Sequence, residues 1–273
     1  MTLLDVSDLR VTFPGRGWRA KPAEVLHGVS LTVDAGETLG LVGESGSGKT
    51  TIGRAVLGLV RPSGGEIAFD GEEISSLKPR DRRHLAKDIQ VVFQDPYTSL
   101  NPSLTVGDIL AEPLVVQGAT AKDARARVKT LLDQVGLPAD AAERLPREFS
   151  GGQRQRVAIA RALAPSPRLI VCDEPVSALD LSTQERVLDL FIEIQRATGV
   201  AYLFVSHDLS VIRHISHRVA VLYRGDLVET GTAAQVTLAP QHAYTQRLLL
   251  AAPVADPVAQ RERREQRRLA LAR

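Results

Sequence analysis

Hydrophobic residues alternate with polar ones, or cluster in short runs, at the start of the chain. Residues 3–13 and 25–33 carry strand-forming side chains between glycine and proline breaks, which predicts two strands joined by a loop. The short apolar run 39–42 then leads into a glycine-rich turn, and residues 51–59 have the pattern of a helix. The pattern therefore predicts a β-rich opening followed by a strand, a loop and a helix.

Strands and helices alternate along the rest of the chain. The apolar run 169–172 is continuous, which is typical of a strand buried on both faces. Because no internal repeat is visible, the alternation predicts an α/β fold with a mostly parallel sheet. The further strands are expected at 66–69, 89–93, 169–172 and 202–205, and the further helices at 121–135, 155–163 and 183–197.

Composition narrows the class of protein. The net charge of +2 comes from 34 Lys and Arg against 32 Asp and Glu. The overall charge of the chain therefore does not favour binding to nucleic acid or to an anionic membrane. The single cysteine, Cys172, excludes a disulfide framework or a four-cysteine cluster made by this chain alone, and favours a reducing compartment. No secretory signal is visible, and the longest apolar stretch, around 248–255, is too short to span a bilayer.

A phosphate-binding motif follows the predicted strand 39–42. Residues 43–50 read GESGSGKT and match G-x-x-x-x-G-K-S/T between a predicted strand and a predicted helix, a context that a chance Gly/Ser linker would lack. The glycines let successive backbone N–H groups point at phosphate oxygens, while Lys49 would reach the β- and γ-phosphates and Thr50 would bind Mg²⁺. The expected ATP-binding residues are Gly43, Glu44, Ser45, Gly46, Ser47, Gly48, Lys49, Thr50 and Thr51.

Two acidic residues end the buried strand predicted at 169–172. Asp173 is placed for Mg²⁺, and Glu174 is placed to polarise an attacking water as a general base. Paired acids at a strand end can equally be a helix cap. Together with the phosphate loop, however, they resemble a Walker B site.

The segment 149–156, FSGGQRQR, resembles the signature motif of ABC ATPases. The resemblance implies that this motif begins a helix whose N-terminus points at the γ-phosphate held by the opposite subunit. A plain helix N-cap at Ser150 is the simpler alternative. The residues expected to contact ATP in trans are Ser150, Gly151, Gly152 and Gln153.

Further family landmarks follow in the family's order. The resemblance implies a Q-loop with Gln94, which would contact Mg²⁺ or the lytic water, a D-loop with Asp180 acting in trans, and a switch His207 at the γ-phosphate. Singly these residues would be unremarkable polar side chains. The resemblance also implies an aromatic residue that stacks on adenine just after the first strand, where Phe13 matches and Trp18 is the alternative. Both side chains could instead pack in the core.

Four segments narrow the resemblance to a branch of the family. The chain resembles ATP-binding subunits of the oligopeptide, dipeptide and nickel importers in four segments: FQDPYTSLNP at 93–102, FSGGQRQR at 149–156, CDEPVSALD at 172–180 and HAYTQRLL at 242–249. Ala243 stands where that branch usually has proline. The resemblance implies a P-loop NTPase of the ABC type: a RecA-like α/β core, an antiparallel β portion and a helical insertion near 95–160. Residues 1–232 would form this cassette, and 233–273 a C-terminal extension.

The chain ends in a basic tail, with six Arg against two Glu from Arg261 onward. Such a tail could contact anionic lipid or a partner, or could be a solvated or disordered end.

The resemblance also implies cofactors, partners and a place in the cell. We expect ATP and Mg²⁺, a head-to-tail dimer with a copy or a paralogue, two transmembrane permease subunits and, indirectly, an extracytoplasmic solute-binding protein. The chain would lie peripherally on the cytoplasmic face of the membrane and energise uptake of peptides, nickel or a related solute, without binding nucleic acid.

A soluble ABC ATPase of DNA repair or translation is the alternative, although the long coiled-coil insertion or second cassette of those proteins is not seen. A regulatory module that does not hydrolyse ATP would be expected to lack Glu174.

Overall fold

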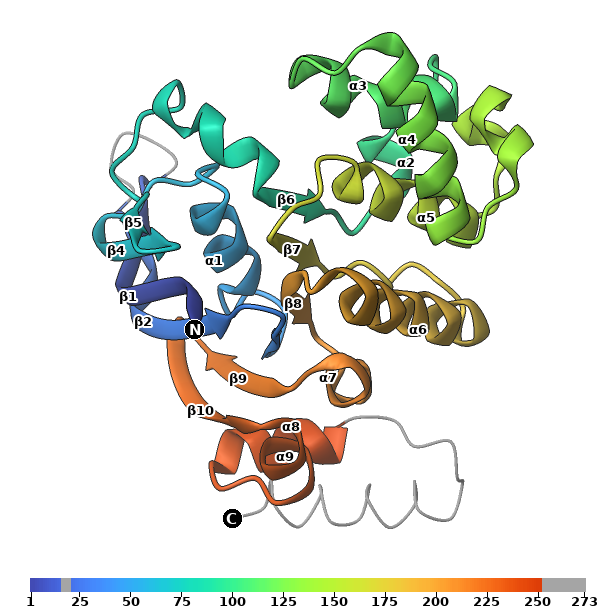
Figure 1. The fold of residues 1–273 in the computed structure, drawn as a ribbon. Helices are drawn as coiled ribbons and strands as arrows, with labels where there is room; N and C mark the ends of the chain where they lie inside the picture. The colour runs from blue at the N-terminus through green and yellow to red at the C-terminus, as the bar shows by residue number, and fades with distance from the viewer. Residues whose placement is uncertain (16–20, 252–273) are drawn as a thin grey trace.

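The computed structural model describes residues 1–15 and 21–251 as two β-sheets, the helices packed on them, and a lobe of helices (Figure 1). Trp18 and the basic tail from Arg261 onward lie outside the described residues. In Figure 1 the antiparallel sheet lies on the left, the helical lobe at the upper right and the C-terminal helices at the bottom. Within the described residues, no helix is both long and apolar enough to cross a membrane.

The smaller sheet is antiparallel and has the strand order β2-β1-β4-β5. Its first two strands pair along their whole length, from Thr2 opposite Asp34 to Phe13 opposite Ala23, as the alternating pattern predicts. At the other edge of β1, β4 pairs with β1 and β5 pairs with β4. The strands of this sheet are β1 (Thr2–Phe13), β2 (Ala23–Asp34), β4 (Gly64–Phe69) and β5 (Glu72–Glu73).

The larger sheet has the order β10-β9-β3-β8-β7-β6, and all its strands are parallel except β10. Apolar side chains fill both of its faces. Along β8, Tyr202 and Phe204 face one hydrophobic core, whereas Leu203 and Val205 face the other. The sheet consists of β3 (Thr38–Val42), β6 (Ile89–Val92), β7 (Leu169–Asp173), β8 (Ala201–Ser206), β9 (Arg218–Tyr223) and β10 (Asp226–Thr232).

Helices cover the two faces of the larger sheet differently. The helix α1 (Lys49–Val56) lies between the two sheets, in the core that also contains the inner face of the antiparallel sheet. The opposite face packs against α5 (Gly151–Leu163), α6 (Leu181–Thr198) and α7 (Leu209–Ile215). There the ring of Phe191 packs edge-to-face on Tyr202 and Phe204, with ring centroids 5.4 Å and 5.6 Å apart. The predicted α/β architecture with a mostly parallel sheet is therefore what the structure contains.

The remaining helices form the lobe and the C-terminal end. The lobe contains α2 (Pro96–Ser99), α3 (Val106–Val116), α4 (Ala121–Gln134) and the first turns of α5, with the 3₁₀ turns η2 (Ala139–Glu143) and η3 (Pro146–Glu148). A further 3₁₀ segment, η1 (Asp81–Lys87), precedes β6. The chain then ends, within the described residues, in α8 (Ala233–Leu238) and α9 (Ala243–Ala251).

Helix α1 differs from the expected range 51–59 at both ends. It begins at Lys49, because Gly48 adopts a left-handed φ of 108° and closes the loop directly onto the helix. It ends at Val56, whose carbonyl oxygen accepts a hydrogen bond from Arg82 at 2.6 Å. The phosphate-binding motif and the helix therefore overlap by two residues.

Candidate nucleotide-binding site

The candidate site lies at the carboxyl edge of the larger sheet. Because β3, β6, β7 and β8 are parallel, their carboxyl ends meet at one edge. The register keeps them level: Val42 lies opposite Ser206, and Val92 opposite Cys172. Residues far apart in the sequence follow these ends within two positions, namely the loop 43–48, Gln94, Glu174 and His207.

The loop after β3 needs glycine for two different reasons. Gly48 has a φ of 108° and Gly46 a φ of 80°, a left-handed region that other residues enter at a cost. Gly43 needs space instead, because a Cβ there would lie 2.1 Å from the carbonyl oxygen of Leu222. The loop is therefore a narrow backbone turn that leads into the N-terminus of α1, the arrangement that suits an anion.

Lys49 is buried within this loop, with 4% of its surface exposed. Its Nζ donates hydrogen bonds to the carbonyl oxygens of Gly43 at 2.7 Å and Glu44 at 2.8 Å. Burial lowers the pKa of this ammonium group, while the nearby carboxylates of Glu174 and Asp173 oppose the shift. An ammonium group has three protons, so one remains for a phosphate oxygen.

Thr50 and Asp173 meet across the site. The hydroxyl of Thr50 donates a hydrogen bond of 2.9 Å to Oδ1 of Asp173. Burial raises the pKa of Asp173, and the bond from Thr50 partly opposes that shift. A hydroxyl and a carboxylate next to a phosphate-binding loop are the oxygen donors that Mg²⁺ uses with phosphates, so these residues fit that ion.

Glu174 has a backbone φ of 48°, which is uncommon outside glycine, and its N–H donates to the carbonyl oxygen of Val205 at 3.0 Å. This bond to β8 fixes the residue next to His207. Its Oε2 lies 3.1 Å from Nδ1 of His207 and accepts a hydrogen bond of 3.4 Å from Nε2 of Gln94. The structure thus brings together three polar residues that follow three different strands.

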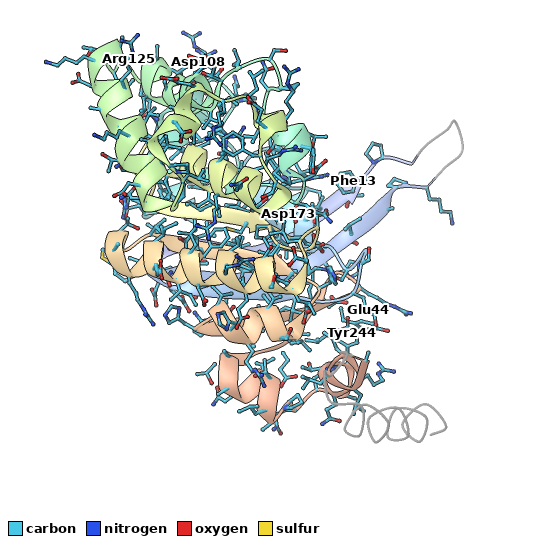
Figure 2. All side chains as sticks on the ribbon, turned by 90° about the vertical axis from the view of Figure 1, so that its right-hand side faces the viewer. Phe13, Glu44, Asp108, Arg125, Asp173 and Tyr244 are labelled. Carbon is cyan, nitrogen blue, oxygen red and sulfur yellow. The ribbon has the colours of Figure 1, made fainter. Side chains whose placement is uncertain are left out.

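A pocket of about 230 Å³ is lined by Lys49, Thr50 and Glu174, whereas Asp173, Gln94 and His207 do not line it. Phe13, at the end of β1, lines this pocket and is 40% exposed, so its ring is available to a ligand. In Figure 2, Phe13, Asp173 and Glu44 lie along one side of the molecule. Val25 also lines the pocket, and nothing in the sequence beyond its strand position pointed to that role. The pocket is lined by Phe13, Val25, Ser45, Gly46, Gly48, Lys49, Thr50, Thr51 and Glu174.

The signature and D-loop residues lie together but do not line this pocket. Ser150 caps α5: its hydroxyl accepts from the N–H of Gln153 at 3.3 Å, and the Gln153 side chain accepts from the N–H of Ser150 at 3.0 Å. Gly152 lies so close to α6 that a Cβ would come within 2.3 Å of Thr183.

Asp180 caps α6. Its side chain accepts from the hydroxyl of Ser182 at 2.7 Å and the N–H of Thr183 at 3.0 Å, and these bonds lower its pKa to about 2. The two segments therefore present two helix N-termini beside one another, apart from the phosphate loop of the same chain.

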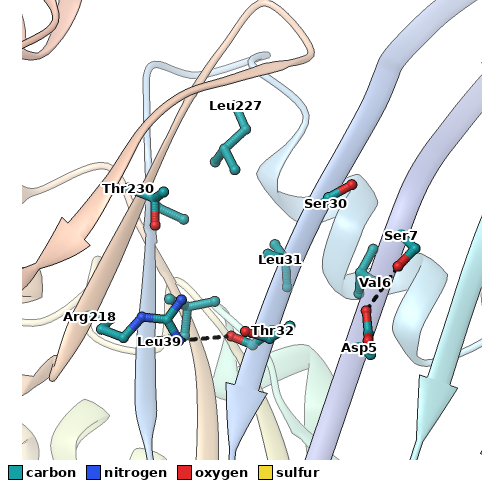
Figure 3. A pocket seen from close by; sticks show the side chains of 11 residues that line it. Asp5, Val6, Ser7, Ser30, Leu31, Thr32, Leu39, Arg218, Leu227 and Thr230 are labelled. Carbon is teal, nitrogen blue, oxygen red and sulfur yellow. Dashed lines mark hydrogen bonds between the residues drawn. The ribbon is translucent and has the colours of Figure 1, made fainter. Parts of the chain in front are cut away.

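A second hollow, of about 300 Å³, lies between β1 and β2 on one side and β9 and β10 on the other (Figure 3). Arg218 reaches across it to the carbonyl oxygen of Thr32 at 3.4 Å and forms an ion pair of 3.2 Å with buried Glu37. None of the residues predicted for ATP or Mg²⁺ lines this hollow.

Known proteins resemble this chain along most of its length. Residues 26–177 match the family described as ABC transporter. The glutathione import ATP-binding protein GsiA of Escherichia coli K12 is 52% identical over 267 residues, which cover 96% of this chain and 43% of that protein. The protein of the same name from Pectobacterium atrosepticum is 51% identical over 269 residues, covering 97% and 43%. The chain thus spans less than half the length of these curated relatives.

Solved structures share the fold. The dimeric ATP-binding cassette MJ0796, in a post-hydrolysis state bound to ADP and Pi, has a TM-score of 0.75 and 29% sequence identity, covering 85% of this chain and 99% of that one. CbiO1 of Clostridium perfringens, part of the ABC transporter complex cbiONQ, has a TM-score of 0.77 and 26% identity, covering 86% and 90%. The predicted fold class is confirmed: the chain belongs to the ABC transporter family and has the P-loop ATPase cassette fold of that family.

Proposed function

We propose that this chain binds ATP with Mg²⁺, hydrolyses it as half of a head-to-tail cassette dimer, and thereby drives uptake of a peptide-like solute through a membrane permease. The observation that carries the proposal is the hydrogen bond between Thr50, which follows the phosphate loop, and Asp173, at the end of β7. It joins a phosphate-binding element to a carboxylate pair, the combination that phosphoryl transfer to water requires.

The loop residues bind the triphosphate. Lys49, Thr50 and Thr51, at the start of α1, line the pocket, where backbone N–H groups of a helix N-terminus suit an anion. Lys49 adds a positive charge, and its ammonium group also donates to two loop carbonyl oxygens. The hydroxyl of Thr51 would add a phosphate contact, and the ring of Phe13 would stack on adenine at the open end of the pocket.

Thr50, Asp173 and Gln94 would hold Mg²⁺. The ion would neutralise charge on the phosphates when bound. The bond from Thr50 to Asp173 holds these two oxygen atoms 2.9 Å apart. Gln94 follows β6, and its amide donates a hydrogen bond to Glu174, the residue next to Asp173.

Glu174 is the proposed general base. A carboxylate that takes a proton from water must face the γ-phosphate, and Glu174 lines the pocket together with Lys49 and Thr50. His207, 3.1 Å from the same carboxylate, would orient it and contact the γ-phosphate. The left-handed φ of Glu174 and its N–H bond to Val205 fix the start of the side chain.

The second half of the site would come from a partner. The N-termini of α5 and α6 lie outside the pocket lined by this chain's own phosphate loop. They contain Ser150, Gly151, Gly152, Gln153 and Asp180. A rotated copy, or a paralogue, would place these residues over the γ-phosphate, where the positive end of α5 favours negative charge. The MJ0796 cassette is described as dimeric, which supports this assembly.

The importer role rests on the relatives. Proteins that are 51–52% identical to this chain are named for glutathione import, and glutathione is a small peptide. Two permease subunits would dock on the helical lobe, where Tyr97, Val115 and Val116 are 60%, 54% and 82% exposed. The chain would then lie on the cytoplasmic face of the membrane and receive solute indirectly through an extracytoplasmic binding protein.

Replacing the proposed base should separate binding from turnover. In Glu174→Gln the carboxylate can no longer accept a proton, so we expect ATP hydrolysis to fall by about 100-fold or more while ATP still binds. Phosphate release and ATP binding, measured on the same preparation, test this. Turnover close to that of the wild type would contradict the assignment.

Removing the loop lysine should weaken binding itself. Because charge-assisted hydrogen bonds to phosphate are strong, Lys49→Ala should bind ATP roughly 10- to 100-fold more weakly and lose turnover in parallel. Titration calorimetry measures the affinity, and Lys129→Ala, an exposed lysine on α4, is the matched control. Unchanged affinity in Lys49→Ala would show that the lysine does not contact the nucleotide.

Crosslinking tests the shared site. Gly151 tolerates a side chain, since a Cβ there would lie 3.6 Å from Leu179, whereas Gly152 does not. In a Cys172→Ala, Glu174→Gln background, Ser45→Cys and Gly151→Cys should join two chains only with ATP and Mg²⁺. The single-cysteine chains are the controls. A crosslink within one chain, or one that forms between chains without ATP, would contradict the head-to-tail arrangement.

Uptake assays test the solute. Cells that lack this chain should take up labelled glutathione and short peptides again when the wild-type chain is restored, but not when Lys49→Ala is restored. Uptake of labelled Ni²⁺, the alternative solute, is measured in the same cells. Peptide uptake that is independent of this chain would contradict the proposed substrate class.

A further inference from the structure

The C-terminal helix α9 contacts the phosphate loop directly. Tyr244, in the first turn of α9, is 2% exposed, and its hydroxyl accepts a hydrogen bond of 2.9 Å from the backbone N–H of Glu44. Figure 2 shows the two residues one above the other on the side of the molecule that carries the site. These residues are 200 positions apart in the sequence.

Tyr244 is held in place by the end of the larger sheet. Its ring packs on Tyr223, the last residue of β9, with ring centroids 4.2 Å apart. The carboxylate of Glu229, in β10, accepts from the N–H groups of Gln241 at 2.7 Å and His242 at 3.1 Å. These bonds fix the turn that begins α9, so the hydroxyl of Tyr244 is presented to the loop by a rigid support.

We propose that Tyr244 is a positioning residue that holds the phosphate loop in its ATP-binding shape, an inference that rests on the proposed ATPase function. The backbone of Glu44 is hydrogen-bonded at both of its polar groups. Its carbonyl oxygen accepts from Lys49, within the loop, and its N–H donates to the hydroxyl of Tyr244, outside the loop. Farther along, the N–H of Gly225 bonds the carbonyl oxygen of Ser47 at 3.0 Å. Two anchors from the C-terminal part of the chain thus fix the outer side of the loop.

Anchoring raises affinity because a loop that is already ordered loses less entropy when it binds phosphate. Removing the hydroxyl of Tyr244 would leave the N–H of Glu44 facing a phenyl ring. Since the ring is almost fully buried, water could replace the lost acceptor only in part. The start of the loop would then sample conformations that do not bind ATP.

The test is Tyr244→Phe, which keeps the ring and its contact with Tyr223. In the full chain with Mg²⁺, ATP should bind about 3- to 10-fold more weakly, and the KM for ATP should rise by a similar factor. The value of kcat at saturating ATP should change less than 2-fold, roughly, because the bound loop keeps the same catalytic groups.

Tyr202→Phe is the matched control for lost stability. Tyr202 is also buried, and its hydroxyl donates to the carbonyl oxygen of Phe191 at 3.2 Å. It pairs with Thr38, at the end of the sheet opposite the phosphate loop. Both variants should lower the melting temperature, but only Tyr244→Phe should weaken ATP binding.

Two results would overturn the inference: wild-type ATP affinity in Tyr244→Phe, or an equal loss of affinity in Tyr202→Phe, which would make the effect one of general stability. A wild-type chain that binds no ATP would instead contradict the proposed function, and this inference with it.

Discussion

Parallel pairing in the larger sheet is the constraint on which the site depends. Because β3, β7 and β8 run in the same direction and in level register, the loop after β3 meets the two carboxylates at the end of β7 and the histidine after β8. Such strands bury both faces, and this chain supplies two separate cores to cover them. The hydrogen bond from Thr50 to Asp173 is possible only at that shared edge.

The backbone of the phosphate loop is held in place by contacts on its outer side. Its glycines allow turns that other residues would strain, and Gly43 lies against the end of β9 with no room for a side chain. Contacts from β9, from Gly225 and from Tyr244 hold the outer side of the loop, which leaves the inner N–H groups for a ligand. Glu174, which also lines the pocket, has an uncommon left-handed φ of 48°.

Two groups of candidate site residues lie apart from each other in this chain. Groups suited to bind phosphate and metal and to activate water lie together, whereas Ser150 and Asp180 cap two neighbouring helices elsewhere. Packing of Gly152 against Thr183 ties those two helix starts together. A partner that supplied this pair of helix ends would therefore supply both at once, which is the physical basis for the proposed dimer.

The sequence alone determined the strand and the loop that carry most of the candidate site. The run 169–172 predicted a buried strand ending in two acids, and 43–50 predicted a glycine turn with a lysine, because such patterns depend on residues that are neighbours in the chain. It could not show that His207 and Gln94 share one carboxylate, since that depends on strand order. Nor did it predict β9, β10 or α9 as elements. The contact of Tyr244 with Glu44 was decided only by tertiary structure, because it joins residues 200 positions apart through packing that no local pattern encodes.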